Sequence, residues 1–297
     1  MDISLPRLLD DETRYNEAFN ELAKYSKKFE SFSSWTDKVY PELVIQKLRQ
    51  DNESTLRVMD IGSGTGEIAL GFVSKLMTKF PDVLSTIVEP NQKSLTIFKE
   101  KVTQRGLLSV EWDWQNKTWD QYYRDLKTVG NARNHFDLIT SVHSIYHLGD
   151  TDTVIAQLLD CLVEGGVLIL TLTAAYLTSW KFSDRFPMLP ESIFSERSSS
   201  SVKQLLGKNE IQYEAKQMPL IIDIPDCFDP ENEEGQLMLD FLMHVSQFRK
   251  TAPSDLVNAV LDGIGSPDFA TKEDGKIIVN GTVDTIVIKK FSGNVQK

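Results

Sequence analysis

The sequence is poor in cysteine and in positive charge. It contains two cysteines, Cys161 and Cys227, which are too few for a disulfide framework in a chain of 297 residues. We therefore expect two reduced thiols, and we predict no metal site. Lys and Arg number 32 against 43 Asp and Glu, so the net charge is -11. This charge disfavours binding to nucleic acid or to an anionic membrane and favours a small cationic ligand.

The chain also lacks the long apolar segments of membrane and secreted proteins. Its first residues do not form the basic and then apolar run of a signal peptide. The most apolar stretch, residues 158–177, is interrupted by Asp160, Glu164 and a pair of glycines. With 41% hydrophobic and 25% charged residues, the composition is that of a folded globular protein. We expect a cytoplasmic protein.

Short apolar segments alternate with amphipathic ones through the first two thirds of the chain. The predicted strands cover residues 56–61, 84–89, 109–114, 136–141 and 166–173, and the predicted helices cover about 67–80, 91–105, 118–127 and 151–163. Apolar residues at helical spacing predict a further helix within residues 12–30. Two more strands, at 211–223 and 276–290, enclose a segment with two predicted helices. This alternation predicts an α/β fold with a parallel sheet and helices on both faces.

A glycine-rich stretch follows the first predicted strand. Gly62, Gly64 and Gly66 allow backbone N–H groups and a helix N-terminus to approach a ligand without interference from Cβ atoms. A dinucleotide-binding fingerprint has its third glycine one position later, so binding of NAD is disfavoured. Asp60 places a carboxylate at the strand end, where it repels a pyrophosphate and attracts a cation. The predicted ligand therefore carries positive charge.

Glu89 closes the second predicted strand. A carboxylate in this position can accept hydrogen bonds from both hydroxyl groups of a ribose. Together with Asp60 and the glycine-rich stretch, Glu89 predicts a ligand that contains a nucleoside. A plain structural turn is the alternative interpretation of the glycines.

These segments resemble the motif series of class I S-adenosylmethionine-dependent methyltransferases. The resemblance spans about residues 40–175 and rests on residues 58–66, on Glu89, on the strand at 136–139 and on the turn at 162–168. It implies a Rossmann-like, seven-stranded and mostly parallel sheet. It also implies S-adenosylmethionine as the cofactor.

Pattern and resemblance together assign the cofactor contacts. The predicted cofactor-binding residues are Asp60, Gly62, Gly64, Gly66, Glu89, Ser94, Thr118 and Val142. By the resemblance, the first two glycines lie along the methionine part of the cofactor and the glutamate holds the ribose. The resemblance also places Ser94 and Thr118 near the adenine, and Val142 beside the adenosine or methionine portion.

The rest of the chain resembles the histamine N-methyltransferases nearly end to end. The matching segments are residues 15, 19, 185–187, 223–228, 240–242, 251–256 and 272–288. The resemblance implies a monomeric cytoplasmic enzyme that methylates a ring nitrogen of histamine, with a helical substrate-binding cap. We therefore expect cap helices within residues 1–50 and 225–275, a cofactor domain at 51–224, and a final strand and tail at 276–297.

Three positions that hold histamine in that family carry other residues here. The resemblance aligns a glutamate of the family with Lys28, a glutamine with His143 and an asparagine with Gly281. An ammonium in place of a carboxylate reverses the sign of a contact, which disfavours a bare protonated amine and favours an acceptor that carries an anion. The alternative for Lys28 is a solvated surface lysine.

His143 is the predicted catalytic residue. It follows the fourth predicted strand, at the end where open α/β sheets bind ligands, and its imidazole could accept a proton or orient a substrate. A hydrogen-bonded loop histidine is the alternative. Aromatic faces can pack a flat ring and stabilise positive charge, so five residues are candidate walls of a dry acceptor pocket or, equally, parts of the core. They are Tyr15, Phe19, Tyr146, Trp180 and Phe241.

The sequence thus predicts an S-adenosylmethionine-dependent N-methyltransferase for a small amine or imidazole compound similar to histamine. One alternative is an acceptor that is a carboxylated imidazole, such as carnosine or histidine, or another biogenic amine. A second alternative is a protein that binds the cofactor and has lost catalysis. Because each alternative requires the cofactor, the glycine-rich stretch and Glu89 do not separate them.

Overall fold

In a computed structural model, the chain forms two compact units. The structure describes residues 5–49, 54–128, 135–174, 186, 189, 198–224, 227–267, 270–273 and 276–291. The sheet unit comprises residues 32–172, 199–218 and 284–297, and the helical unit comprises residues 1–31, 173–198 and 219–283. Residues 32–50, which we expected in the cap, therefore cluster with the sheet.

The strands confirm the predicted α/β class. They are β1 (Leu56–Ile61), β2 (Val83–Val88), β3 (Glu111–Gln115), β4 (Phe136–Val142), β5 (Leu162–Thr173), β6 (Glu214–Ile224), β7 (Thr271–Glu273) and β8 (Lys276–Lys289). The sheet has the order β3-β2-β1-β4-β5-β8-β6, and β7 pairs with β8. The pairs β1–β2, β1–β4, β2–β3 and β4–β5 are parallel. The predicted count of seven strands omits β7, whose three residues are exposed and give no alternating pattern.

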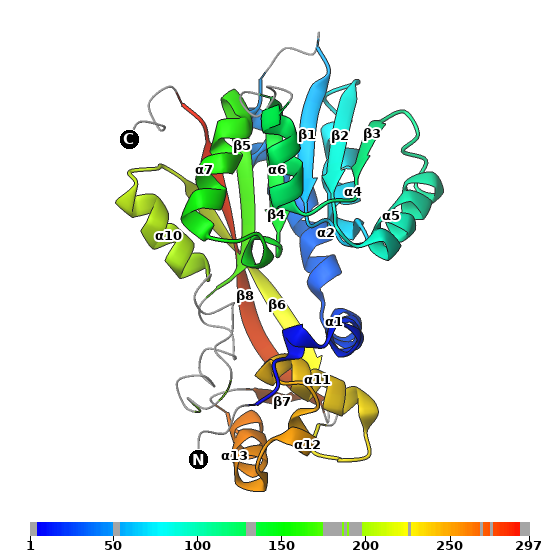
Figure 1. The fold of residues 1–297 in the computed structure, drawn as a ribbon, viewed down its shortest axis with the longest axis vertical. Coiled ribbons are helices and arrows are strands. Elements are labelled where there is room, and N and C mark those ends of the chain that lie inside the picture. Colours follow the sequence, from blue (N-terminus) through cyan, green and yellow to red (C-terminus); the bar gives the residue numbers. More distant parts are fainter. Residues whose placement is uncertain are drawn as a thin grey trace. The chain divides into compact units, whose positions relative to one another are not determined.

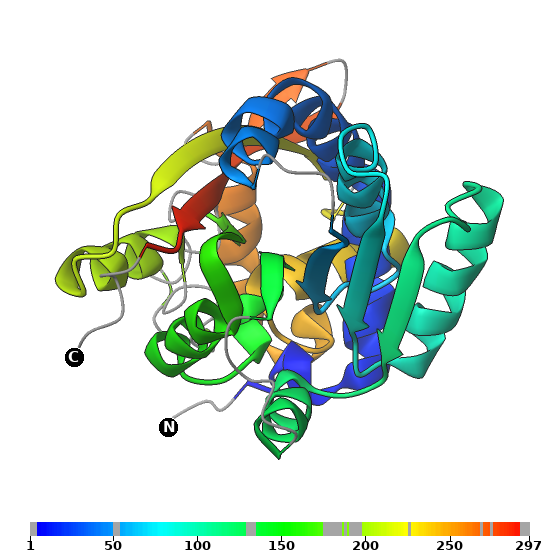
Figure 2. The same cartoon turned by 90° about the horizontal axis from the view of Figure 1, so that it is seen from above.

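Helices cover both faces of the parallel part of the sheet. The longer ones are α1 (Glu12–Tyr25), α2 (Lys28–Lys38), α4 (Glu67–Leu76), α5 (Gln92–Gln104), α6 (Trp119–Thr128), α7 (Thr151–Cys161), α10 (Ser199–Lys208), α11 (Glu233–Met243) and α13 (Ser254–Ile264). Short helical turns are η1 (Leu8–Asp10), α3 (Tyr40–Leu43), η2 (Ile45–Lys47), η3 (Ile145–His147) and α12 (Phe248–Thr251). Figures 1 and 2 show α6 and α7 on one face of the sheet and α4 and α5 on the other.

The helix predicted within residues 12–30 is confirmed as α1, but it ends at Tyr25 and a second helix, α2, begins at Lys28. Ser26 has an extended backbone (φ -96°, ψ 143°) and forms an antiparallel bridge with Ile222 of β6. The next residue, Lys27, donates its N–H to the carbonyl of Ile221 at 2.9 Å. Pairing with a distant strand thus outweighs the helical preference of the intervening residues.

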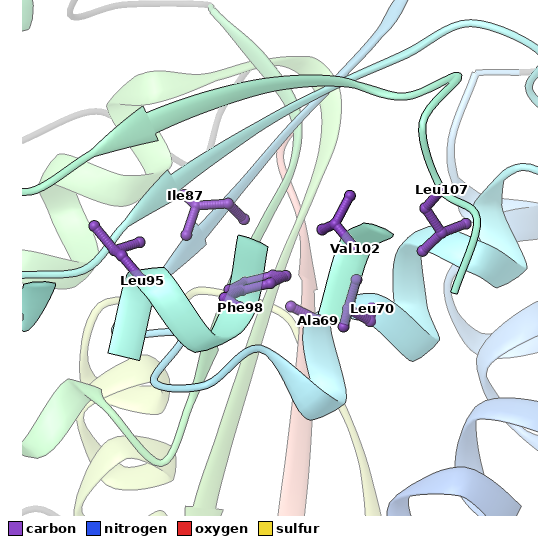
Figure 3. Packing of buried hydrophobic residues seen from close by; sticks show 7 residues of the cluster. All are labelled: Ala69, Leu70, Ile87, Leu95, Phe98, Val102 and Leu107. Carbon is purple, nitrogen blue, oxygen red and sulfur yellow. The ribbon is translucent and has the colours of Figure 1, made fainter. Parts of the chain in front are cut away.

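The core on the α4–α5 face is built around Phe98. Its ring lies beside Ala69 and Leu70 of α4 (Figure 3), and Trp112 and Trp114 of β3 meet it edge to face. The N-cap of α4 is Gly66, which has φ +76°, and a Cβ atom there would lie 2.3 Å from the Phe98 ring. The third glycine of the loop is therefore required by helix packing.

We expect Gly66→Ala to lower the free energy of unfolding by about 2–4 kcal/mol, because overpacking adds to the strain of a left-handed backbone. Gly106→Ala is the matched control: Gly106 has φ +68°, and a Cβ atom there would meet no atom within 4 Å, so only the strain of about 1 kcal/mol applies. Denaturant unfolding measures both. Equal losses for the two variants would contradict the packing role of Gly66.

Candidate functional site

The candidate cofactor site lies at the carboxyl ends of β1, β2 and β4. The chain leaves β1 toward β2 and leaves β4 toward β5, so the order of the sheet reverses between β1 and β4. Open α/β sheets bind ligands at such a switch point. In the parallel register, Asp60 of β1 faces Thr140 of β4, and the glycine-rich stretch follows β1 directly.

The carboxylate of Glu89 is buried and held by two backbone donors. Its Oε2 accepts a hydrogen bond from the N–H of Gly64, and its Oε1 accepts one from the N–H of Asn91, both at 2.8 Å. Asn116 fixes the same turn, since its Nδ2 donates to the carbonyls of Glu89 at 3.1 Å and Pro90 at 2.8 Å. Each carboxylate oxygen retains acceptor capacity. Glu89 can therefore accept hydrogen bonds from two adjacent hydroxyl groups.

The three glycines of the loop have different surroundings. A Cβ atom on Gly62 would lie 2.4 Å from Cβ of Ser144, and one on Gly66 would enter the Phe98 ring. Gly64 has φ +55°, and a Cβ there would meet no atom within 4 Å. The loop is thus closed against the protein at its two ends and open at Gly64. This arrangement fits a ligand that approaches the backbone at the centre of the loop.

Asp60 contributes a second buried carboxylate beside the loop. It is 6% exposed and accepts a hydrogen bond from Oγ1 of Thr140. Burial raises the pKa of Asp60 to about 6, and the negative charge of Glu89 adds to the increase. Among the described residues, no lysine, arginine or histidine forms an ion pair with either carboxylate. A ligand that brings an amino group would supply the missing positive charge.

Several residues that support this site were not predicted. Oγ of Ser144 donates to the carbonyl of Ile61 at 2.5 Å and forms a 2.7 Å hydrogen bond with Oγ of Ser141. These bonds attach the residues after β4 to the end of β1, and they explain why position 62 is a glycine. The supporting role of Asn91 had a sequence signal, because it is an asparagine directly before a helix. No feature of the sequence indicated the supporting role of Ser144.

Ser94 and Thr118 lie at helix starts that follow β2 and β3. The N–H of Ser94 donates to Oδ1 of Asn91, the N-cap of α5. Thr118 and Gln121 bond reciprocally at the start of α6: the Thr118 N–H donates to Oε1 of Gln121, and the Gln121 N–H donates to Oγ1 of Thr118. Both positions thus have a local structural role, and their contacts with adenine stay predictions.

His143 occupies the first position after Val142, the last residue of β4. Its backbone is left-handed, with φ +52°, and its N–H donates to the carbonyl of Thr171 at 2.9 Å. The imidazole meets the ring of Phe32 edge to face at 6.0 Å and lies 6.5 Å from the ring of Tyr146. A positive φ at a residue other than glycine costs energy and is common at functional sites. Tyr146 is 1% exposed and belongs to the core.

Three predicted acceptor residues of the helical unit form a cluster. The ring centroids of Tyr15, Phe19 and Phe241 lie 6.3 Å apart in each pair, and we call these rings the aromatic triad. Nζ of Lys28 lies 5.4 Å from the centroid of the Phe19 ring. Lys28 is half-buried, and burial lowers its pKa to about 8. The structure therefore brings a lysine ammonium against an aromatic face.

Two predicted substrate-binding residues remain, Gly281 and Trp180. Gly281 is buried within β8, and Trp180 lies outside the described residues. Cys161 and Cys227 are buried and are not joined by a disulfide. In the described part of the chain, no group of His, Cys, Asp and Glu residues could hold a metal ion. No helix among the described residues is long and apolar enough to cross a membrane.

We expect Gly64→Ala to weaken binding of S-adenosylmethionine at least tenfold, because the added methyl group would occupy the open space in front of the loop. Gly106→Ala has a comparable positive φ and a comparable open surrounding, but it lies outside the glycine-rich stretch. Both variants should lose about 1 kcal/mol of stability. Calorimetric titration measures the affinity, and equal affinity of the two variants would remove Gly64 from the site.

Asp60→Asn should stabilise the cofactor-free protein and weaken the cofactor complex. The pKa of the Asp60 carboxyl group is 3.8 in the unfolded chain and about 6 in the folded protein. The free energy of unfolding of the wild-type protein therefore falls as the pH rises between these two values. At pH 7 the amide should raise the free energy of unfolding by about 1–3 kcal/mol. Cofactor affinity should fall at least tenfold, because the amide lacks the charge that pairs with an amino group. Denaturant unfolding at pH 4 and pH 7, with calorimetric titration, tests both; a destabilised variant with normal affinity would contradict the assignment.

Known proteins resemble this chain in sequence and in fold. The methyltransferase domain family matches residues 32–216. Histamine N-methyltransferase of Xenopus tropicalis is 28% identical over 98% of this chain and 100% of its own length. Carnosine N-methyltransferase 2 of Gallus gallus is 27% identical over 92% of this chain and 85% of its own. The YcgJ protein from Bacillus subtilis has a similar fold, with a TM-score of 0.51 and 15% identity over 89% of this chain and 99% of that one.

The family match covers well over half of the chain and includes β1 to β5 with the glycine-rich stretch, Asp60, Glu89 and His143. It confirms the predictions of a methyltransferase and of S-adenosylmethionine as its cofactor. The full-length similarity to histamine N-methyltransferases likewise confirms the resemblance seen in the sequence. The chain belongs to the methyltransferase domain family.

Proposed function

We propose that this protein transfers the methyl group of S-adenosylmethionine to a nitrogen of a small amine or imidazole compound. One observation carries the proposal: two buried carboxylates, Asp60 and Glu89, flank a glycine-rich loop that is open at Gly64. The relatives act on the class of acceptor that we propose, since their names specify histamine and carnosine.

We assign a different part of the cofactor to each of the proposed binding residues. Asp60 pairs with the amino group of the methionine portion, because it is a carboxylate without a cationic partner among the described residues. Glu89 accepts the hydroxyl groups of the ribose, since its two oxygens are already oriented by Gly64 and Asn91. Val142 flanks the cofactor at the end of β4, and Ser94 and Thr118 lie toward the adenine.

When bound, S-adenosylmethionine supplies an activated methyl group on a sulfonium. The protein then has to align the acceptor nitrogen with that group and exclude water. The nitrogen must be unprotonated, and an imidazole with a pKa of about 6.5 meets this condition near neutral pH. A strong base is therefore not required for an imidazole acceptor.

His143 is suited to orient the acceptor or to receive its proton. The residue stands at the end of β4, and its ring is constrained by the Phe32 ring and by its left-handed backbone. Such constraint limits the orientations of the imidazole, which favours proton transfer or positioning of an acceptor. Within the helical unit, we assign acceptor contacts to the aromatic triad and to Lys28.

We further propose a monomeric cytoplasmic protein that does not bind nucleic acid. Two buried free thiols suit a reducing compartment, and a net charge of -11 opposes polyanions. The second candidate function is binding of the cofactor without catalysis. It is favoured by one observation, the presence of Lys28, His143 and Gly281 at the positions that hold histamine in the family that the sequence resembles.

Transfer of labelled methyl groups from S-adenosylmethionine to histamine and to carnosine tests the reaction. We expect turnover of at least one of them, and Glu89→Gln should raise the KM for the cofactor by roughly 10–100-fold, because one charge-assisted acceptor is lost. Glu111→Gln, an exposed carboxylate on β3, is the matched control and should be neutral. Cofactor binding without transfer to any small amine would favour the non-catalytic alternative.

His143→Asn should lower kcat by about 100-fold and leave cofactor affinity unchanged, because proton transfer or orientation is lost while the cofactor contacts remain. Asparagine tolerates a positive φ, so this variant preserves the backbone better than alanine. His147→Asn, at an exposed position in η3, is the control. Steady-state kinetics at saturating cofactor provides the measurement, and an unchanged kcat would assign His143 a structural role.

A further inference from the structure

Lys28 is a half-buried cation that lacks a carboxylate partner among the described residues. No ion pair or hydrogen bond of its ammonium group occurs there, and the group instead contacts the Phe19 ring. Cations of the neighbouring helix α1 are paired: Arg14 with Asp240 at 2.7 Å, and Lys24 with Glu21 and Glu234. In contrast to these two cations of α1, the half-buried Lys28 has no ion-pair partner among the described residues.

The position of Lys28 is costly unless a ligand compensates it. Burial lowers its pKa to about 8, which means that the surroundings stabilise the ammonium less well than water does. The Phe19 ring returns a part of the lost stabilisation through a cation–π contact at 5.4 Å. Stabilisation by an anion is missing, and an anion would form a charge-assisted hydrogen bond with this group.

The aromatic triad defines the chemistry of the neighbouring ligand portion. Tyr15 and Phe19 are stacked with an interplanar angle of 12°, and the Phe241 ring is tilted against both. All three residues are only half-buried, so the rings are not fully covered by the protein. A second cation would share these faces with the Lys28 ammonium and would be repelled by it. A ligand with an anionic end and an apolar or aromatic body suits both features.

We propose that Lys28 binds the carboxylate of the methyl acceptor, and that this protein therefore acts on carboxylate-bearing imidazoles or amines in preference to bare amines. This inference rests on the proposed methyltransferase function and names the substrate class within it. A free amino acid and the C-terminus of a short peptide present the same carboxylate, and their different lengths allow an experiment to separate them.

The test uses acceptor pairs that differ in the carboxylate. Histidine is compared with histamine, and carnosine with the analogue of carnosine that lacks its carboxylate. Binding of each compound to the full-length protein saturated with S-adenosylhomocysteine is measured by calorimetry, and methyl transfer is measured in parallel. Wild-type protein should bind one carboxylated compound at least tenfold more tightly than its partner. The preferred pair then identifies the free amino acid or the peptide as the source of the carboxylate.

Lys28→Met removes the charge and keeps the length of the side chain. It should abolish the preference for the carboxylated compound, which corresponds to a loss of roughly 10–100-fold in its affinity. Lys28→Glu should invert the preference toward histamine. Lys27→Met removes a charge from an exposed position one residue earlier and should leave the preference unchanged. Cofactor affinity serves as the control for folding of every variant.

Two results would overturn the inference. One is a wild-type preference for the bare amines, and the other is a preference for carboxylates that persists in Lys28→Met. Failure of the proposed function is a separate result, namely no methyl transfer to any compound. In that case a calorimetric preference that depends on Lys28 would still support the carboxylate site, and its absence would refute it.

Discussion

The carboxylate of Glu89 connects the parts of the candidate cofactor site to one another. By accepting the N–H groups of Gly64 and Asn91, it joins the loop after β1 to the turn before α5. Charge-assisted bonds to backbone donors are strong in a buried setting, so this one side chain limits the freedom of both segments. The start of α5 in turn positions Phe98, whose ring leaves no room for a side chain at position 66. Packing of the sheet face and shape of the loop thus depend on the same carboxylate.

The site also concentrates negative charge at a cost to the cofactor-free protein. Asp60 is buried near Glu89, and its raised pKa measures how poorly the fold stabilises the ionised carboxyl group. A stable fold alone would favour an amide at this position. A cationic ligand explains the presence of a carboxylate here. In the complex, the ionised Asp60 attracts the ligand's positive charge, and this attraction offsets the cost of burying the carboxylate. Lys28 in the helical unit is a comparable case with a positive charge. Its lowered pKa shows that the fold stabilises the ammonium group poorly, and an anionic ligand would relieve that penalty.

Features that depend on local sequence were predictable, and features that depend on distant pairing were not. The strand ends that carry Asp60 and Glu89 follow from short apolar runs before turn residues. The break between α1 and α2 is caused by pairing of Ser26 with Ile222. Nothing in the sequence near either residue predicts this pairing. Likewise, the contact of Ser144 with the carbonyl of Ile61 exists because β4 pairs with β1. Residues beneath a site are harder to predict than residues that line it, because their partners are distant in the sequence.

The residues proposed to bind the cofactor lie in the sheet unit, whereas the aromatic triad and Lys28, which we propose as acceptor contacts, lie in the helical unit. The proposed cofactor contacts follow strand ends of the sheet unit, where backbone geometry dictates glycines and the sheet dictates spacing. The aromatic triad and Lys28 arise from helix faces of the helical unit, where a side chain can change without altering a strand register or a turn. On the proposed assignment of Lys28, substitution of this single charge on α2 changes the acceptor class and leaves the methyl donor unaffected. This separation explains how a strongly constrained glycine-rich loop and an unpaired lysine on α2 can occur in one chain.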